Sequence, residues 1–191
     1  MTRLILPFLL IYFSHFISAQ NSPFGLKAGM NISTIGGDSE NVSPKTGIHG
    51  GFFSSLSLSE NFKLKPELVL SNQGCKDSEN NKLRFSYWYL NAPLMIRYQE
   101  GSPGFLDFGI QLGTVIHANT RENGEKRNVT GGLENFDISL CAGVGFDLSE
   151  STAFEARYIG GLTNTSKNPE VEGETFPNRV FQFTIAYVLF K

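Results

Sequence analysis

Hydrophobic and polar residues alternate along most of this chain, and a period of two residues predicts β-strands with two different faces. In the segment 106–117 the even-numbered residues are mainly large and apolar, while the odd-numbered ones include Asp107, Gln111 and two glycines. Further segments alternate in the same way, and together they make eight predicted strands: 24–32, 48–58, 62–70, 85–98, 106–117, 136–148, 154–162 and 181–189. The chain is therefore predicted to be all-β.

One segment breaks its own alternation. The apolar positions of segment 85–98 are odd-numbered up to Tyr89 and even-numbered from Leu90 onward. A single inserted residue produces such a change of phase, so we expect a β-bulge near Tyr89.

Alternation alone does not say which face points inward, because a soluble barrel such as a lipocalin buries its apolar face. Most of the segments have about 9–12 residues and two are slightly longer, enough to cross a bilayer at a tilt of about 45°, whereas strands of soluble proteins usually have about 5–6. Their apolar face carries no Asp, Glu, Lys or Arg, as contact with hydrocarbon demands. We therefore predict an eight-stranded antiparallel up-and-down transmembrane β-barrel with its apolar face toward lipid.

The polar face carries basic and acidic side chains in equal number. The basic ones are Lys27, Lys63, Lys65, Arg97 and Arg157, and the acidic ones are Glu67, Asp107, Asp137, Asp147 and Glu155. Unpaired charges would be costly in a narrow lumen, so we expect these side chains to form a lumen charge network. An eight-stranded barrel is just wide enough to be filled by its own side chains, and a free diffusion pore is not expected.

The connections between the segments alternate between long and short. Long ones are expected at 34–46, 73–82, 118–132 and 163–178, and short ones at 59–61, 99–103 and 149–151. Long loops at one end and tight turns at the other are typical of outer-membrane barrels. Aromatic residues on the apolar face at the short-turn end are expected at the membrane interface: Phe24, Phe62, Tyr98, Phe146, Phe154 and Tyr187.

The first 19 residues have the features of a secretory signal peptide. Arg3 supplies a cationic start, an apolar stretch of about 14 residues follows, and Ala19 is a small residue at the expected cleavage position. A spanning helix would need roughly 20 apolar residues, and Pro7 and His15 argue against it. Cleavage after Ala19 would leave residues 20–191 as an exported barrel domain in the cell outer membrane.

Composition and charge narrow the classes of function. The chain has 191 residues, 16 basic and 18 acidic side chains and a net charge of −2, so it lacks the global positive charge of a nucleic-acid-binding protein. Its two cysteines are too few for a disulfide scaffold or a structural zinc site, and a disulfide between Cys75 and Cys141 is geometrically doubtful. The acidic tract Glu170, Glu172 and Glu174 could bind a divalent ion, but a solvated loop is the favoured interpretation. We expect no cofactor and no metal.

Some polar residues could in principle form a catalytic set. His49 and His117 are predicted to face the lumen, where Ser55 or Ser57 with Glu67 or Asp107 could complete a hydrolase-like set. Ordinary hydrogen-bonded lumen residues are the favoured interpretation, and no catalytic residue is assigned.

Two alternatives to a non-enzymatic membrane barrel stay open. A lipid-modifying barrel hydrolase would place one of the two histidines beside a serine and a carboxylate near a rim. A soluble lipocalin-like binder would point Phe108, Leu112, Ile138 and Leu140 inward.

The chain resembles the PorT-like outer-membrane β-barrel proteins of Gram-negative bacteria over essentially its whole mature length. The matching segments are 24–33 (FGLKAGMNIS), 66–74 (PELVLSNQG), 89–98 (YLNAPLMIRY), 142–145 (AGVG), 157–164 (RYIGGLTN) and 178–181 (NRVF). The resemblance implies an outer-membrane barrel, in a family most of whose members have no established activity and a few of which are linked to protein secretion and gliding machinery. Expected partners are outer-membrane lipid, the barrel-assembly machinery during biogenesis and an envelope protein, but no nucleic acid.

The C-terminus departs from the usual pattern of such barrels, which end in an aromatic residue that the assembly machinery recognises. Here Phe190 falls in the lumen phase and Lys191 follows it. Either the last strand twists at its end, or Tyr187 and Leu189 serve as that signal.

Overall fold

The computed structural model describes residues 22–36, 42–78, 83–122, 125–130, 136–164 and 176–190. The proposed signal peptide and the acidic tract at 170–174 lie outside the described residues. Within those ranges, no helix is long and apolar enough to cross a membrane.

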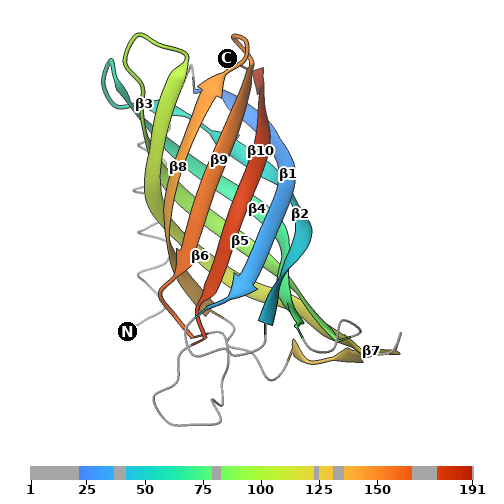
Figure 1. The fold of residues 1–191 in the computed structure, drawn as a ribbon. Coiled ribbons are helices and arrows are strands. Elements are labelled where there is room, and N and C mark those ends of the chain that lie inside the picture. The colour runs from blue at the N-terminus through green and yellow to red at the C-terminus, as the bar shows by residue number, and fades with distance from the viewer. Residues whose placement is uncertain are drawn as a thin grey trace, which may run out of the picture.

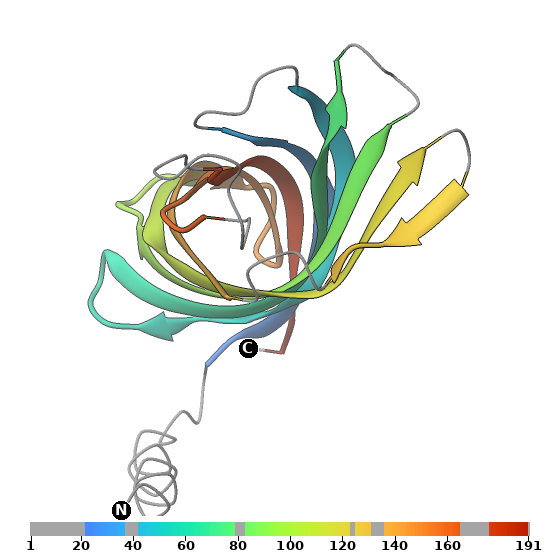
Figure 2. The same ribbon diagram turned by 90° about the horizontal axis from the view of Figure 1, so that it is seen from below.

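The described strands close into a barrel (Figures 1 and 2). The barrel strands are β1 (Phe24–Ile35), β2 (Val42–Ser54), β4 (Phe62–Asp77), β5 (Arg84–Tyr98), β6 (Gly104–Glu122), β8 (Phe136–Asp147), β9 (Thr152–Gly161) and β10 (Asn178–Phe190). All pairings are antiparallel, and β1 with β10 and β2 with β4 complete the ring. The short β3 (Leu56–Ser57) continues β2 along β4. The predicted eight-stranded antiparallel barrel is confirmed.

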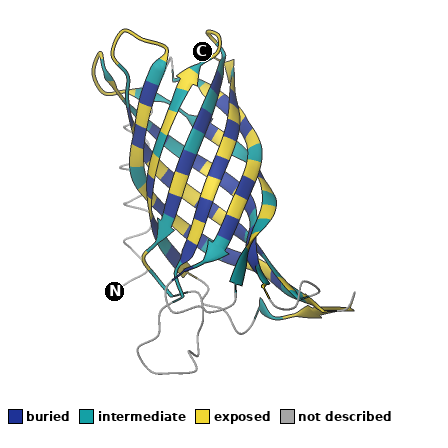
Figure 3. Ribbon diagram, in the orientation of Figure 1, coloured by how far each residue is buried: buried dark blue, intermediate teal, exposed yellow. Residues whose placement is uncertain are grey.

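The apolar face of the barrel points outward. Phe108 and Leu140 are each 54% exposed and Leu112 is 43% exposed, and exposed and buried residues alternate along each strand (Figure 3). A soluble barrel would bury this face, so the lipocalin-like alternative is wrong. The outer surface is instead suited to hydrocarbon.

The two ends of the barrel differ. The turns at 58–61, 99–103 and 148–151 lie at the end where β10 finishes, which we call the short-turn end; the opposite end is the long-loop end (Figure 1). At the long-loop end β4 runs to Asp77 and β6 to Glu122, and β7 (Glu125–Asn128) pairs with the last residues of β6. Parts of the loops expected at 73–82 and 118–132 are therefore strands, and so are residues 34–35 and 42–46 of the loop expected at 34–46. Both faces of these extensions are largely polar, so the sequence pattern gave no strand signal there.

The bulge expected near Tyr89 lies in the neighbouring strand. Trp88 pairs with His117 and Tyr89 pairs with Val115, which leaves Ile116 of β6 as the extra residue. β5 keeps its alternation, so Tyr87 and Tyr89 point inward and are only 5% and 2% exposed. The insertion turns His117 to the outer face, where it is exposed, and its predicted lumen position is wrong.

A second irregularity turns the side chain of the last residue of β10 to the opposite face of the sheet. Gly25 pairs with Val188 and Phe24 with Phe190, so Leu189 is the extra residue. Directly opposed residues lie on the same face, and Phe190 therefore shares the outer face of Phe24 and is 68% exposed. The lumen position expected for Phe190 is wrong, because the strand end is bulged.

The ladder between β2 and β4 is interrupted near the long-loop end. Pro44 pairs with Cys75 and His49 with Ser71, which leaves one extra residue on β2. Side chains of β1 reach across this gap. Asn31 Nδ2 donates to Asn72 O at 3.1 Å, and Ser33 Oγ both donates to Gly74 O and accepts from Gly74 N at 2.9 Å. Backbone groups that lost their ladder partners are thus satisfied by side chains.

A substitution at Leu140, which lies midway along β8, tests whether the outward apolar face contacts lipid. In lipid vesicles Leu140→Arg should lower the free energy of unfolding by about 2–4 kcal/mol, because a charge then sits near the bilayer midplane. Urea-dependent unfolding measures this loss. Leu148→Arg, at the short-turn end, is the matched control and should cost only about 0–1 kcal/mol. Equal costs at the two positions would contradict the membrane orientation.

Candidate functional site

Charged side chains from five strands meet inside the barrel, on the inward positions that the alternation predicts. They are Lys27 of β1, Lys65 and Glu67 of β4, Arg97 of β5, Asp107 of β6, and Glu155 and Arg157 of β9. All are buried. We call these seven residues the charged plug.

Glu155 is the centre of the charged plug. Its Oε1 accepts from Lys65 Nζ at 2.7 Å and from Arg97 Nη2 at 2.6 Å, and its Oε2 accepts from Lys27 Nζ at 3.0 Å. Arg157 Nη2 lies 3.5 Å from Oε2. One carboxylate thus contacts all four cations of the charged plug.

Two arginines hold the other carboxylates in two-point pairs. Arg97 donates from Nε and Nη2 to the two oxygens of Asp107, both at 2.8 Å. Arg157 donates from Nη1 and Nη2 to the two oxygens of Glu67, also at 2.8 Å. Such paired contacts fix the orientation of both groups as well as their distance. Lys27 adds a third contact to Glu67 at 2.9 Å.

Three of the ten residues predicted for the lumen network lie outside the charged plug. Lys63 donates to Gln99, which donates in turn to Asp147 at 2.7 Å, at the short-turn end. Asp137 lies toward the other end and accepts from Ser139 and Thr163. The charged plug therefore holds four cations and three carboxylates rather than five of each. The sequence pattern predicts the face of a side chain but not its depth in a tilted barrel.

Apolar layers lie on both sides of the charged plug. Toward the short turns, the Phe105 ring centre lies 3.2 Å from Arg97 Cζ and the Phe53 ring centre lies 5.1 Å from Lys65 Nζ. A cavity of about 550 Å³ opens beyond them at the short-turn end and reaches Lys65, Arg97 and Glu155. On the other side lie buried layers of Met95, Cys141, Ile159 and Val180 and of Tyr87, Tyr89, Val115 and Ala118. The lumen is closed in its middle by packed side chains.

His49 is fully engaged in neutral contacts. Its Nδ1 lies 2.7 Å from Asn31 Oδ1 and its Nε2 lies 2.9 Å from Thr184 Oγ1. Neither nitrogen contacts a serine or a carboxylate, and Ser57 is exposed on β3. The hydrolase-like set is thus not assembled by the described residues. Within these ranges there is also no group of three or more side chains placed to hold a metal ion.

The two cysteines lie apart in the lumen. Both Cys75 and Cys141 are free and buried. Cys141 packs with Met95, Ile159 and Val180. They therefore fill the interior as apolar side chains.

Aromatic rings line the outer face at the short-turn end. The ring pairs Phe24–Phe52, Phe62–Tyr98 and Phe146–Phe154 have centroids 5.8, 5.1 and 5.6 Å apart. Tyr187 is 50% exposed on the same outer face. Phe52 is the member that sequence reasoning missed, although its outward phase in segment 48–58 was a sufficient signal. Tyr158 and Phe181 form a further pair on the outer face, nearer the long-loop end, with centroids 4.9 Å apart.

Solved structures resemble this barrel at low sequence identity. Neisserial surface protein A is 9% identical with a TM-score of 0.60, and the match covers 88% of this chain and 99% of that one. Ail, the attachment invasion locus protein of Yersinia pestis, is 10% identical with a TM-score of 0.55, over 89% of this chain and 100% of that one. Both similarities show the fold alone. No curated protein sequence matches this chain.

A family model covers most of the sequence. The model described as "Outer membrane protein beta-barrel domain" matches residues 18–167, and the closed barrel with its apolar outer face agrees with that description. The chain therefore belongs to the outer membrane protein β-barrel domain family and is an outer-membrane β-barrel protein.

Proposed function

We propose that this protein is a non-enzymatic outer-membrane barrel of the PorT-like type, which acts through the surface it presents and not through a pore or an active site. The observation that carries this proposal is the charged plug. Ion pairs such as Arg97–Asp107 and Arg157–Glu67 occupy the space through which a solute would pass. A barrel built for diffusion would leave that space to water.

Energetics supports a structural role for the charged plug. Removing a charge from water costs several kcal/mol, and pairing compensates only where the geometry is good and the remaining hydrogen-bonding positions are filled. Both oxygens of Glu67, Asp107 and Glu155 have cationic partners. The pairs tie β9 to strands on the other side of the lumen. The charged plug thus cross-links the wall while it blocks the channel.

The long-loop end is the proposed surface for a protein partner. There β4, β5 and β6 continue past the apolar band, and β7 adds an exposed strand beside β6 (Figure 2). An exposed edge strand offers unpaired backbone groups to another chain. The PorT-like resemblance adds an envelope protein of a secretion or gliding machinery as the class of partner.

The chain is exported across the inner membrane and then assembled into the outer membrane. Residues 1–19 act as a signal peptide that is cleaved after Ala19, and residues 20–191 form the mature barrel. The barrel-assembly machinery then reads the aromatic end of β10, where Tyr187 and Phe190 are both exposed on the outer face.

Cell fractionation tests the location together with the fold. The mature chain should appear in the outer-membrane fraction, and unheated samples should migrate differently from boiled ones on a detergent gel, because the closed sheet resists unfolding. Recovery as a soluble periplasmic protein would overturn the proposal. The mass of the mature chain also tests cleavage after Ala19.

Conductance tests the closed lumen. In planar lipid bilayers the purified barrel should show little or no ion conductance, because side chains fill its middle. A general porin reconstituted in the same way is the positive control. Stable large channels would contradict a sealed barrel.

Glu155→Gln tests the role of the charged plug in stability. The substitution leaves four buried cations with two carboxylates and should lower the free energy of unfolding by about 3–5 kcal/mol, measured by urea unfolding in vesicles. Glu60→Gln, in an exposed turn, should change it by no more than about 0.5 kcal/mol.

A second substitution separates charge balance from lost packing. Adding Lys65→Met to Glu155→Gln returns the excess to one positive charge and should recover part of the loss. If Glu155→Gln costs no more than Glu60→Gln, the proposed cross-linking role of the charged plug is wrong.

A further inference from the structure

Four cations stand in one row across the extended strands at the long-loop end. Lys76 of β4 pairs with Arg84 of β5, Arg84 with Arg121 of β6, and Arg121 with Lys126 of β7. Residues directly opposed on neighbouring antiparallel strands have Cβ atoms about 4.5–5.5 Å apart and share a face. We call these four residues the cation row.

Among the described residues, no carboxylate pairs with the cation row. Like charges directly opposite each other destabilise a sheet, and here three successive pairs have the same sign. In the part of the chain that the structure describes, none of the four side chains has an ion pair or a hydrogen bond. The carboxylates of Asp77 and Glu122 belong to the opposite face, because neighbouring residues of a strand alternate. An external anion would relieve the repulsion between these four side chains.

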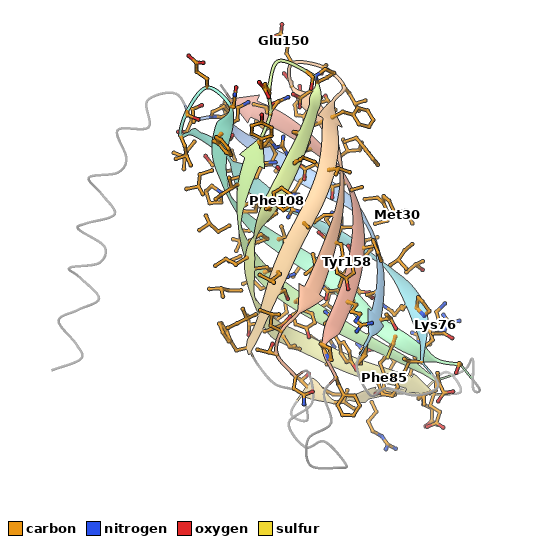
Figure 4. All side chains as sticks on the ribbon, turned by 60° about the vertical axis from the view of Figure 1, so that its left-hand side comes forward. Met30, Lys76, Phe85, Phe108, Glu150 and Tyr158 are labelled. Carbon is orange, nitrogen blue, oxygen red and sulfur yellow. The ribbon has the colours of Figure 1, made fainter. Side chains whose placement is uncertain are left out.

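The cation row lies on the outer face, in line with the surface that contacts lipid. Successive outward rows on β4, β5 and β6 change from apolar to aromatic to polar before the cations are reached: Leu70, Leu90 and Thr114; then Asn72, Trp88 and His117; then Gly74, Ser86 and Asn119. Lys76 is at the lower end of the barrel wall in Figure 4, beyond the band that includes Met30 and Phe108.

The depth of the cation row matches a headgroup layer. It stands six residues beyond the leucine row, which is about 20 Å along a strand and about 15 Å along the membrane normal at a tilt of about 40°. Trp88 lies between them at the height where an aromatic ring marks the membrane interface. Long Lys and Arg side chains can bend toward that interface while their stems cover apolar surface.

We propose that the long-loop end faces the cell exterior, as the long loops of outer-membrane barrels do, and that the cation row binds the phosphate groups of outer-leaflet lipid headgroups. Arg84 and Arg121 occupy the middle of the row, and guanidinium groups bind phosphate oxygens in a two-point geometry. The row spans four strands, about 14 Å, so it has room for a headgroup that carries more than one phosphate. A membrane lipid is favoured over a soluble polyanion because the row continues the lipid-facing wall. This site is separate from the charged plug and does not depend on a sealed lumen.

The test uses the mature full-length barrel, folded in detergent and titrated with diphosphorylated lipid A. Trp88 is the only tryptophan of the chain and stands two outward rows from the cations, so its fluorescence provides a binding curve. Replacing Lys76, Arg84, Arg121 and Lys126 together by Gln should weaken binding at least tenfold. Added salt should weaken the binding of lipid A to the wild-type barrel, because salt screens the attraction between phosphate and the cations. Native mass spectrometry counts the bound lipid independently.

A neighbouring residue offers a matched control. Arg127 follows Lys126 on β7 but points to the opposite face, so Arg127→Gln should leave binding within twofold of the wild type. Lys126→Gln should weaken lipid A binding more than Arg127→Gln does. This pair of single variants, both in an exposed hairpin, keeps the test decisive if the quadruple variant does not fold, which the heat-dependent gel shift reveals.

Three results would overturn the proposal. The first is equal binding by the wild type and by the folded variants of the cation row. The second is equal binding of lipid A and its dephosphorylated form, which would show that phosphate is not recognised. The third is binding of a soluble sulfated oligosaccharide to the row without binding of the phosphorylated lipid, which would assign the row to a polyanion outside the membrane.

Discussion

A strand surrounded by hydrocarbon has no water to satisfy its backbone, so every N–H and C=O needs a partner within the protein. The closed ring of pairings meets this requirement, and backbone groups find partners even at the interruption between β2 and β4, which lies near the polar end of the lipid-facing wall. Where the insertion on β2 separates the two ladders, the side chains of Asn31 and Ser33 bond to the backbone of β4. Closure also fixes the width of the interior, and that width determines what the lumen can contain.

The contents of the lumen follow from this narrow width. Glycines make room for large side chains at some levels: a Cβ on Gly145 would lie 2.4 Å from the Phe105 ring, and one on Gly29 would lie 2.9 Å from the His49 ring. At the level of Glu155 the space is filled by ions, which are costly to bury. An apolar filling would be more stable in principle, but it would make the inward face of each strand resemble the outward face. Charged residues at inward positions fix the orientation of the strands that carry them, because turning Lys65 or Glu155 toward lipid is prohibitive.

The sequence was sufficient to predict the faces and the strand order. Phe108 and Asp107 lie on opposite faces because a strand alternates, and only a lipid environment explains a wholly uncharged apolar face. The sequence was insufficient wherever one residue is inserted. Nothing in the amino-acid sequence marks Ile116 and Leu189 as extra residues. The change of face that each one causes is visible only in the pairing with the next strand. Depth was equally hidden: Asp137 and Asp107 have the same inward phase, but strand tilt places them at different levels and only one joins the charged plug.

The insertion at Ile116 gives the two parts of β6 opposite phases. Before it, odd-numbered residues enter the lumen; after it, odd-numbered residues face outward, and this brings Arg121 into line with Arg84. Loss of that one residue would exchange the outer and inner surfaces of everything beyond it on β6, with no other change in the sequence. A sequence alignment that assigns inward and outward positions by hydrophobic alternation would therefore assign the wrong faces beyond this point in relatives that lack the insertion. The number of residues in this strand therefore determines which of its side chains face outward from the barrel and which face the lumen.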